Sequence, residues 1–341
     1  MSEALTAELL SLLQKRFPLS PRPYEEIAKS LGISEDEVLQ RVKEQKEASI
    51  IRQISPIFDT KRLGYSSSLV AFKMPEEKID RAVEIINSHP GVSHNYERDH
   101  DFNIWFTLAV APDSKLGLEK TVALLAEKTE ADDAIILPTL KMFKIAVKLN
   151  TTGKDAKKEK VVKKKHKEIE LTPLHHEIIR HTQYDLPIEK EPFKEVVEKL
   201  SLDYDTLFHT LHELQDAGVM RRFAAILNHR KAGFNANAMV VWDVDPAKGE
   251  EIGKKAAAFS AVSHCYLRPK YENWPYNLFT MVHGKTTEET NAIIDSIAEE
   301  IEHKDKRPLY STREFKKVRI KYYTPDFAEW EEKMTAENGG V

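Results

Sequence analysis

The chain has 341 residues, a formal net charge of -4 and a pI near 6.4. This length predicts two or more domains, and 41% hydrophobic with 9% aromatic residues is typical of a globular protein with buried cores. The mildly acidic balance argues against a protein whose main task is to bind nucleic acid. No run of about 18 apolar residues occurs, so we expect no membrane span.

A single cysteine, Cys265, excludes an intramolecular disulfide and a metal site built from cysteines. The first residues carry neither the basic segment nor the apolar segment of a secretory signal. The cytoplasm is therefore the expected compartment.

The N-terminal segment predicts three short helices followed by a wing. Residues 5–13 have a helical apolar period, and a second helix is expected over residues 24–31. Ser34 followed by Glu37 is the signature of a capping box, which opens the third helix. Alternation over residues 50–57 then predicts a pair of wing strands. These elements together predict a winged helix-turn-helix.

From Tyr65 onward the pattern alternates between strands and helices. The expected elements are strands at residues 68–73, 92–97, 104–110 and 134–148 and helices at residues 76–88 and 115–128. The order βαββαβ describes a ferredoxin-like domain, in which two helices cover an antiparallel sheet.

Residues 151–170 interrupt this pattern with eight lysines, four acidic residues and no aromatic residue. We interpret them as a solvated, flexible linker, and binding of nucleic acid or anionic lipid by the basic run is the alternative.

The whole plan then repeats. Residues 48–54 match 217–223 at an offset of 169, and residues 90–98 match 260–268 at an offset of 170. Residues 63–65 also match 232–234. A period this long indicates a duplication of domains rather than a solenoid.

The predicted fold is therefore α+β, with two tandem copies of a winged helix-turn-helix plus a ferredoxin-like βαββαβ domain. The first copy comprises residues 1–60 and 61–150, and the second comprises 171–229 and 230–325. The Lys-rich linker at 151–170 joins them, and residues 326–341 are expected to form a C-terminal tail.

Both helices that would read DNA carry the wrong charge for that task. Residues 34–37 place three carboxylates where phosphates would lie. The equivalent helix, residues 201–215, contains three acidic residues and neither Lys nor Arg. Because neutralisation of phosphates supplies most of the affinity for DNA, we expect no DNA binding and interpret the winged modules as scaffold or dimerisation elements.

A strand motif, Val-Ser-His-x-Tyr-x-Arg, occurs in both copies, at residues 92–98 and 262–268. Side chains alternate along a strand, so the His, Tyr and Arg are expected on one face and the intervening residues on the other. The three face-sharing residues are His94, Tyr96 and Arg98 in the first copy and His264, Tyr266 and Arg268 in the second.

Such a face suits a large planar ligand with carboxylate substituents. Arginine offers bidentate contacts, histidine offers proton transfer, and tyrosine offers stacking and hydrogen bonding. The alternative is that His and Tyr are half-buried packing residues and that Arg98 pairs with an acid such as Glu97 or Asp99. Recurrence of the motif in two halves that otherwise diverge favours the ligand.

The loops after the motif differ between the copies. Asn103 and Asn277 fix the register, which makes the second loop four residues longer. This loop is aromatic, as expected beside a flat ring, and a hairpin cap is an equal alternative. The two ligand pockets should therefore not be equivalent.

Six further residues are candidates for substrate binding. They are Trp274 and Tyr276 of the longer loop, His100 of the shorter loop, and the wing arginines Arg52, Arg221 and Arg222. For the arginines, ordinary solvent exposure is the alternative. His283 is interpreted as the end of a strand rather than as a metal ligand, and we predict no metal site.

At these residues the sequence resembles the sirohaem decarboxylases, relatives of the Lrp/AsnC regulators. The resemblance covers nearly the whole chain, once in each half, and is most specific at residues 91–98, 103–107, 262–268 and 274–279. In that family two subunits pair as a heterodimer, and here both resemble parts of one fused chain, as in the fused enzymes of the haem d1 pathway.

The resemblance implies that sirohaem is the substrate and loses two acetate carboxyl groups to give didecarboxysirohaem, in haem d1 or alternative haem biosynthesis. His94 and His264 would act as general acids with help from Tyr96 and Tyr266, and the motif arginines would clamp carboxylates.

It further implies no cofactor beyond the iron of the substrate, and a pseudo-heterodimer within one chain whose further dimerisation is left open. A ligand-responsive transcription regulator and a non-catalytic tetrapyrrole carrier are the two alternative functions.

Overall fold

The computed structural model describes residues 3–145, 166–227 and 236–336, so most of the predicted linker lies outside the described residues. The chain divides into two compact units. A helical unit contains Met1–Tyr65, Lys163–His229 and Lys321–Pro325, and a sheet unit contains the remainder. Each unit therefore combines the equivalent domains of both copies.

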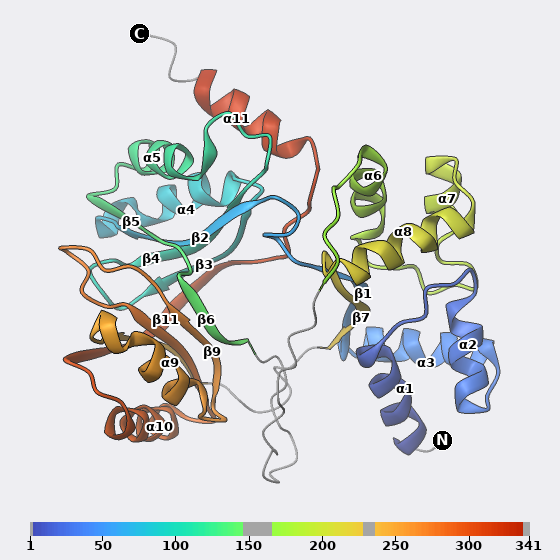
Figure 1. Cartoon of the computed structure of the whole chain (residues 1–341), viewed down its shortest axis with the longest axis horizontal. Helices are drawn as coiled ribbons and strands as arrows, with labels where there is room; N and C mark the ends of the chain where they lie inside the picture. Colours follow the sequence, from blue (N-terminus) through green and yellow to red (C-terminus); the bar gives the residue numbers. More distant parts are fainter. Residues whose placement is uncertain (1–2, 146–165, 228–235, 337–341) are drawn as a thin grey trace. The chain divides into compact units, whose positions relative to one another are not determined.

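In its described residues, the helical unit contains three helices and one strand from each copy, coloured blue for the first copy and green to yellow for the second in Figure 1. They are α1 (Glu3–Lys15), α2 (Pro23–Leu31), α3 (Glu35–Glu47), β1 (Ile51–Phe58), α6 (Pro173–Thr182), α7 (Lys194–Leu200), α8 (Tyr204–Asp216) and β7 (Met220–Leu227). Ser34 caps α3 as predicted, because its hydroxyl accepts a hydrogen bond from the Glu37 amide at 3.2 Å. The Glu37 carboxylate instead accepts from Arg41, at 2.7 Å.

The wing differs from its prediction. We expected a strand pair within each copy, and this is wrong, because β1 pairs antiparallel with β7 of the other copy. Phe223 of β7 packs 5.6 Å from Phe17 and 5.7 Å from Phe193. The two winged modules thus share one aromatic core, which a pattern read within one copy does not reveal.

The sheet unit contains the predicted βαββαβ elements, except that the single strand expected over residues 134–148 is two strands, Asp133–Leu137 and Lys141–Ile145, and residues 146–148 lie outside the described residues. The first copy supplies β2 (Ser66–Lys73), α4 (Ile79–Ser88), β3 (Val92–Arg98), β4 (Ile104–Val110), α5 (Gly117–Thr129), β5 (Asp133–Leu137) and β6 (Lys141–Ile145). The second copy supplies β8 (Ala236–Asp243), α9 (Gly249–Ala257), β9 (Val262–Leu267), β10 (Leu278–Gly284), α10 (Thr287–Glu300) and β11 (Asp305–Lys317). Short 3-10 turns, Glu76–Lys78 and Pro246–Lys248, precede α4 and α9.

Within the described residues, nine strands form one sheet in the order β5-β2-β4-β3-β11-β8-β10-β9-β6. The last strand of each copy crosses to the other copy. The first part of β11 pairs with β8 and its second part with β3, whereas β5 pairs with β2 and β6 pairs with β9. We call β6 and the second part of β11 the exchanged strands. Each half of the sheet is completed by the opposite copy.

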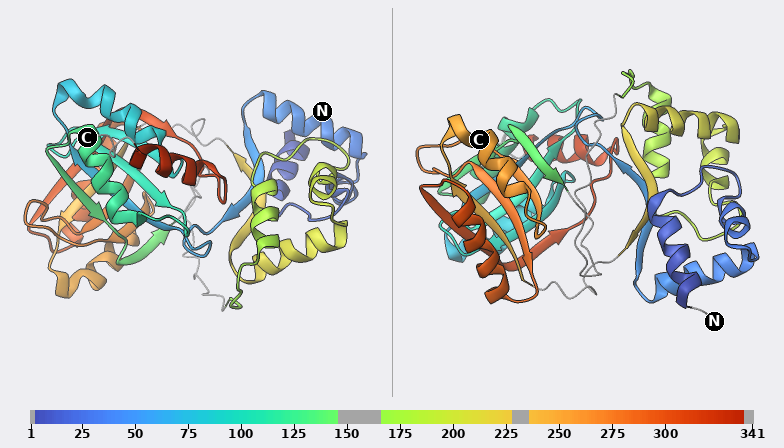
Figure 2. Two further views of the ribbon diagram at one scale, coloured as in Figure 1. Left: turned by 90° about the horizontal axis from the view of Figure 1, so that it is seen from above. Right: turned by 60° about the horizontal axis from the view of Figure 1, so that its bottom comes forward.

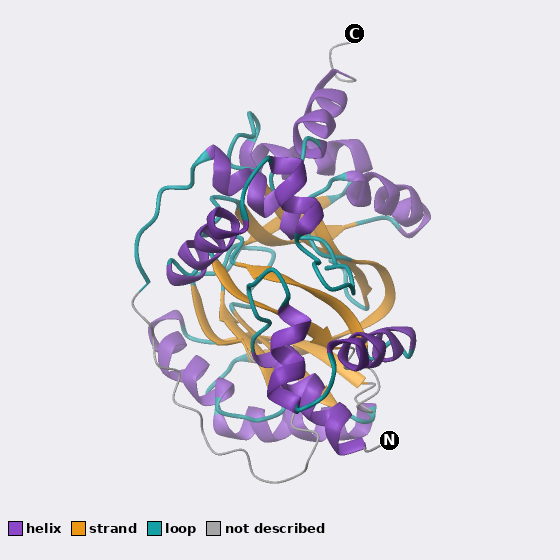
Figure 3. Cartoon of the chain, turned by 90° about the vertical axis from the view of Figure 1, so that its right-hand side faces the viewer, coloured by secondary structure: helices purple, strands orange, loops and turns teal. Residues whose placement is uncertain are grey.

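Helices cover the outer faces of this sheet, and the strands lie between them (Figures 1 and 3). Helices α4 and α5 pack on the first half of the sheet, and α9 and α10 on the second half. A third apolar cluster gathers residues from the opposite face of both halves, including Trp105, Trp274, Phe279 and Leu309. We call this helix-free face of the strands the inner face.

The last described segment is helical rather than an extended tail. Helix α11 (Asp326–Ala336) is the dark red helix near the C-terminus in Figure 2. Its Trp330 and Met334 pack into the outer core of the first half. The Trp330 indole donates a hydrogen bond to Ser88 at 2.9 Å, at the end of α4. The apolar residues of α11, Phe327, Trp330 and Met334, are spaced with a helical period, and this period would have predicted the helix from the sequence.

Candidate functional site

The repeated His-x-Tyr-x-Arg motif lies on β3 and β9. His94 lies across from Thr107 of β4, and Tyr96 lies across from Trp105, which belongs to the inner-face cluster. Directly opposed residues of an antiparallel pair share a face, so the motif points to the inner face. Asn95, across from Phe106, points instead to the helices, where it bonds Asn87.

The two copies give the motif nearly the same geometry. The rings of His94 and Tyr96 stack with centroids 6.3 Å apart and planes at 28°, and those of His264 and Tyr266 are 6.1 Å apart at 29°. All four side chains are half-buried. Two equivalent imidazole–phenol pairs thus lie on the inner face, one in each half of the sheet.

The serine before each histidine departs from simple alternation. We expected Ser93 on the face opposite His94, and this is wrong, because its hydroxyl lies 3.0 Å from His94 Nδ1 and 2.6 Å from Thr107 Oγ1. The register shifts between Val92 and His94, as in a β-bulge, so two residues of β3 oppose one of β4. A similar shift brings Ser263 to His264.

Among the His, Tyr and Arg of the motif, the arginines are the most buried, with Arg98 5% and Arg268 9% exposed. Arg98 Nη1 donates to the Leu309 carbonyl of β11 at 2.7 Å, and Arg268 donates to the Leu137 carbonyl at the end of β5. Each arginine therefore binds the backbone of a strand from the opposite copy.

No acidic side chain among the described residues pairs with Arg98 or Arg268, so the predicted alternative of a Glu97 or Asp99 partner is wrong. Glu97 pairs instead with Arg313. Burial lowers the pKa of both Arg98 and Arg268 to about 10, and the Nε atoms of both are buried without a hydrogen-bond partner in the described part of the chain. A buried guanidinium is stabilised by an anion, so these two residues are suited to carboxylate binding.

In the second copy, His264 belongs to a chain of hydrogen bonds. These hydrogen bonds were not predicted from the sequence. Ser263 Oγ lies 2.7 Å from His264 Nδ1 and 2.5 Å from His283 Nε2. His283 Nδ1 donates to the Asn237 amide oxygen at 2.7 Å. Burial lowers the pKa of His264, and burial together with the nearby His264 lowers the pKa of His283 to about 4.

The exchanged strands place different side chains beside the two motifs. In the second half of the sheet, β6 puts Met142 across from Tyr266 and Ile145 across from His264. Both are exposed, at 51% and 40%. In the first half, β11 puts Glu314 across from Tyr96 and Lys317 across from His94, and the two charged groups are 3.9 Å apart.

The aromatic residues predicted to contact substrate are largely buried. Trp274 and Tyr276 are 1% and 6% exposed and lie in the inner-face cluster, and the Tyr276 hydroxyl donates to Asp305 at 2.6 Å. The ring of His100 contacts Trp274 edge-on at 5.3 Å. The longer loop thus packs residues of the two copies together, and contact with a substrate stays a prediction.

The wing arginines lie in the helical unit rather than on the inner face. Arg52 is on β1, and Arg221 and Arg222 are on β7, with all three exposed. Arg221 pairs with Asp59 at 2.9 Å, and Arg222 donates to the Gln14 carbonyl at 3.3 Å. Their substrate role stays a prediction.

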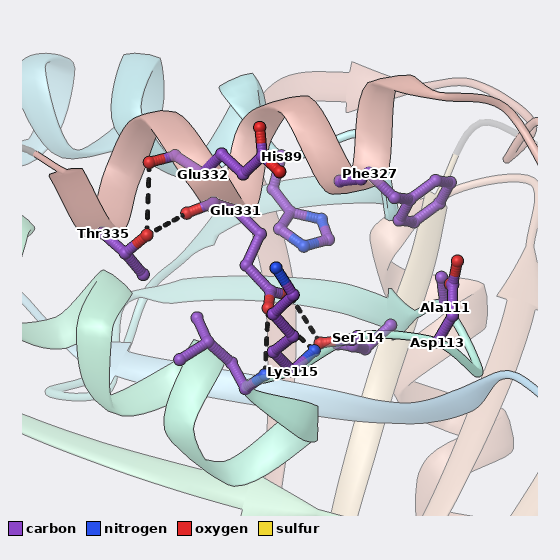
Figure 4. Close-up of a pocket in the computed structure, with 12 residues that line it drawn as sticks. His89, Ala111, Asp113, Ser114, Lys115, Phe327, Glu331, Glu332 and Thr335 are labelled. Atoms are coloured by element: carbon purple, nitrogen blue, oxygen red, sulfur yellow. Dashed lines mark hydrogen bonds between the residues drawn. The ribbon is translucent and has the colours of Figure 1, made fainter.

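A small pocket lies elsewhere in the sheet unit, where α11 meets the start of α5 (Figure 4). Glu331 accepts hydrogen bonds there from the Ser114 hydroxyl and from the amides of Lys115 and Leu116, and so binds the turn that precedes α5. His89 lines the same pocket. Because its acidic group is already bonded to the turn before α5, this pocket is better explained as part of the docking of α11 than as a reaction site.

No group of three or more His, Cys, Asp or Glu side chains in the described residues is placed to hold a metal ion. No helix in those residues is both long and apolar enough to cross a membrane.

Comparison with known proteins identifies the family. The model of the AsnC-like ligand binding domain matches residues 62–144 and 231–316, and the model of the sirohaem decarboxylase NirDL-like helix-turn-helix domain matches residues 7–52 and 175–221. The sirohaem decarboxylase of Hydrogenobacter thermophilus is 42% identical over 323 residues, which are 95% of this chain and 96% of that one. The chain belongs to the sirohaem decarboxylase family.

Two further members of the family bear on the duplication and on the fold. The sirohaem decarboxylase alpha subunit of Desulfovibrio desulfuricans is 45% identical over 147 residues, which are 42% of this chain and 82% of that subunit. The crystal structure of the sirohaem decarboxylase NirDL in complex with an iron-uroporphyrin III analogue has a TM-score of 0.80 and 35% identity, covering 98% of this chain and 99% of that one. The fused, two-copy organisation predicted from the sequence is thereby confirmed.

Proposed function

We propose that this chain is a carboxy-lyase that removes two acetate carboxyl groups from sirohaem, in haem d1 or an alternative haem pathway. The observation that carries the proposal is the full-length similarity to sirohaem decarboxylases, including one in complex with an iron tetrapyrrole analogue. A regulator or a carrier is not favoured, because the chain matches decarboxylases over both copies and their fused arrangement. The single cysteine fits a reducing compartment such as the cytoplasm.

The inner face supplies the chemical groups that such a reaction needs. Sirohaem is a flat ring with several carboxylates, and Arg98 and Arg268 are buried cations with no acidic partner among the described residues. Tyr96 and Tyr266 offer a ring face and a hydroxyl beside each imidazole. We assign the two arginines to carboxylate binding and the two tyrosines to ring contact and hydrogen bonding.

Loss of carbon dioxide breaks the bond between an acetate methylene and its carboxyl carbon, and the electron pair stays on the methylene carbon. The conjugated macrocycle delocalises that charge, so the proposal invokes no cofactor beyond the substrate itself. A proton must then reach the carbon to give a methyl group. His94 and His264 are the candidate proton donors, because each lies half-buried on the inner face beside a tyrosine.

Anaerobic incubation of the whole chain with sirohaem, followed by mass spectrometry of the tetrapyrrole, tests this proposal. The expected product has lost two carboxyl groups as carbon dioxide. Bound tetrapyrrole of unchanged mass would contradict the enzyme and support a carrier. A shift of a DNA probe at low salt, without a change of tetrapyrrole mass, would support a regulator.

A further inference from the structure

We propose that the two inner-face motifs divide the work. His283 and Asn237 position His264 as the proton donor of the second copy, and Lys317 makes the motif of the first copy a carboxylate-binding site. This inference rests on the proposed decarboxylation and assigns its steps to particular residues.

The hydrogen-bond chain of the second copy has only one polarity. The Asn237 amide oxygen can only accept, so His283 Nδ1 carries a proton and donates it. His283 Nε2 then accepts from the Ser263 hydroxyl, and the Ser263 oxygen accepts from His264 Nδ1. Since the low pKa of His283 keeps it neutral near pH 7, this tautomer is the resting state.

This polarity leaves Nε2 of His264 as the atom that binds and releases a proton. With Nδ1 of His264 fixed as a donor to Ser263, the ring is held in one orientation on the inner face. The protonated imidazole can pass its Nε2 proton to the methylene carbon from which carbon dioxide has left, and a proton from solvent restores it. One proton is consumed for each carbon dioxide released, which balances the reaction.

The first copy lacks this chain. Ser93 contacts the Thr107 hydroxyl, and a pair of hydroxyls can donate in either direction. The position equivalent to His283 is Ala109, which lies across from Ser67 just as His283 lies across from Asn237. The hydroxyl pair beside His94 therefore lacks the defined polarity that His283 and Asn237 give to Ser263.

The exchanged strands also distinguish the two motifs, because β6 and β11 place different side chains beside them. Met142 and Ile145 of β6 give His264 and Tyr266 apolar neighbours, which limit hydration of the proton donor and of the developing carbanion. Glu314 and Lys317 occupy the equivalent places in β11 beside Tyr96 and His94. Lys317, across from His94, offers an ammonium group to a substrate carboxylate, so we assign carboxylate binding to the first copy.

Few titratable groups on the inner face lie close enough to His264 to influence its pKa. Its titratable neighbours among the described residues are Tyr266 on β9 and His283 on β10, and β6 adds only uncharged side chains opposite the ring. A change in charge at Asn237 should thus reach His264 through His283.

Two variants test the positioning role. His283→Ala should lower kcat about tenfold and leave KM within about twofold, because it removes orientation rather than a contact with substrate. Asn237→Asp should raise the pKa of His283 and His264, so that activity persists to a pH about half a unit higher. Asn237→Asp retains the acceptor oxygen for His283, so it tests the hydrogen-bond chain even if His283→Ala folds poorly.

Ser67→Asp is the matched control, since it puts the same charge at the equivalent exposed position of β2 without an intervening histidine. Its pH profile should follow that of the unmodified chain. Equal shifts in Asn237→Asp and Ser67→Asp, or unchanged kcat and pH profile in both second-copy variants, would overturn the inference. Failure of the unmodified chain to release carbon dioxide would instead contradict the proposed function.

Discussion

The two copies of the sheet domain carry the same three motif residues, and their surroundings differ. His–Tyr stacking agrees between the copies to 0.2 Å in centroid distance, from 6.3 and 6.1 Å, and both arginines bind a carbonyl of the opposite copy. Their neighbours are a histidine–asparagine chain and apolar side chains in one half, and hydroxyl and charged groups in the other. The two copies thus share the motif side chains and differ in the neighbours of those side chains.

The exchange of strands explains how that divergence arose within a repeated sequence. Each motif strand belongs to one copy and pairs with an exchanged strand of the other copy. Substitutions in β6 therefore change the neighbours of His264 and Tyr266, although β6 lies in the first copy. The predictions that follow test whether this difference between the pockets governs activity.

The largest expected effect is that of the motif histidines. His264→Ala should lower the rate of carbon dioxide release by about 10²- to 10⁴-fold, the usual contribution of a general acid. His94→Ala should cost about tenfold or less, because the first pocket holds substrate in the proposed division. Single-turnover measurements with sirohaem compare the two directly.

Equal losses in His94→Ala and His264→Ala, with a singly decarboxylated product from each variant, would contradict the division. Such a result would mean that each pocket acts on a different acetate.

Sequence patterns predicted most of the elements and the motif strands, because both depend on local spacing. The strand at residues 104–110 has the predicted bounds, and the His-x-Tyr-x-Arg face follows from a period of two. The partners of β1 and β7 and of the exchanged strands were not predictable in this way, because pairing between copies leaves no local signal. Ser263 and His283 were missed as partners because a bulge and a neighbouring strand bring them together.

The second prediction concerns the outer face, where the first copy has His89 and the second has Phe259. Burial, and to a lesser extent Lys316, lower the pKa of His89 to about 3 from 6.5. Between these values the unfolded chain binds a proton that the folded chain does not, so stability falls as the pH falls. His89→Phe should remove about 2.6 kcal/mol of the stability loss between pH 7.5 and pH 4.5.

Urea unfolding at the two pH values measures this difference. At pH 7.5 the variant should be less stable by about 1 kcal/mol, because the Gly91 amide loses its hydrogen bond to His89 Nδ1. The same loss of stability on acidification in the variant and in the unmodified chain would show that His89 is protonated while folded.

The third prediction converts the second pocket to the pattern of the first. Met142→Glu combined with Ile145→Lys places the β11 pair beside Tyr266 and His264. Hydration and the added charges should lower kcat about tenfold, since a proton donor is most effective in a site that excludes water. The reverse double variant, Glu314→Met with Lys317→Ile, is the matched control and should affect KM more than kcat.

The smallest expected effect is at Lys317 alone. Lys317→Gln removes a positive charge across from His94 and should raise KM for sirohaem about threefold, with kcat within about twofold. A half-exposed ammonium contributes little to carboxylate binding once salt screens it, so the difference in KM should shrink at high ionic strength. Steady-state assays at low and high salt measure both effects. A fall in kcat with unchanged KM would place Lys317 among the groups that act on the reacting carbon, and the first pocket would then be more than a holder of carboxylates.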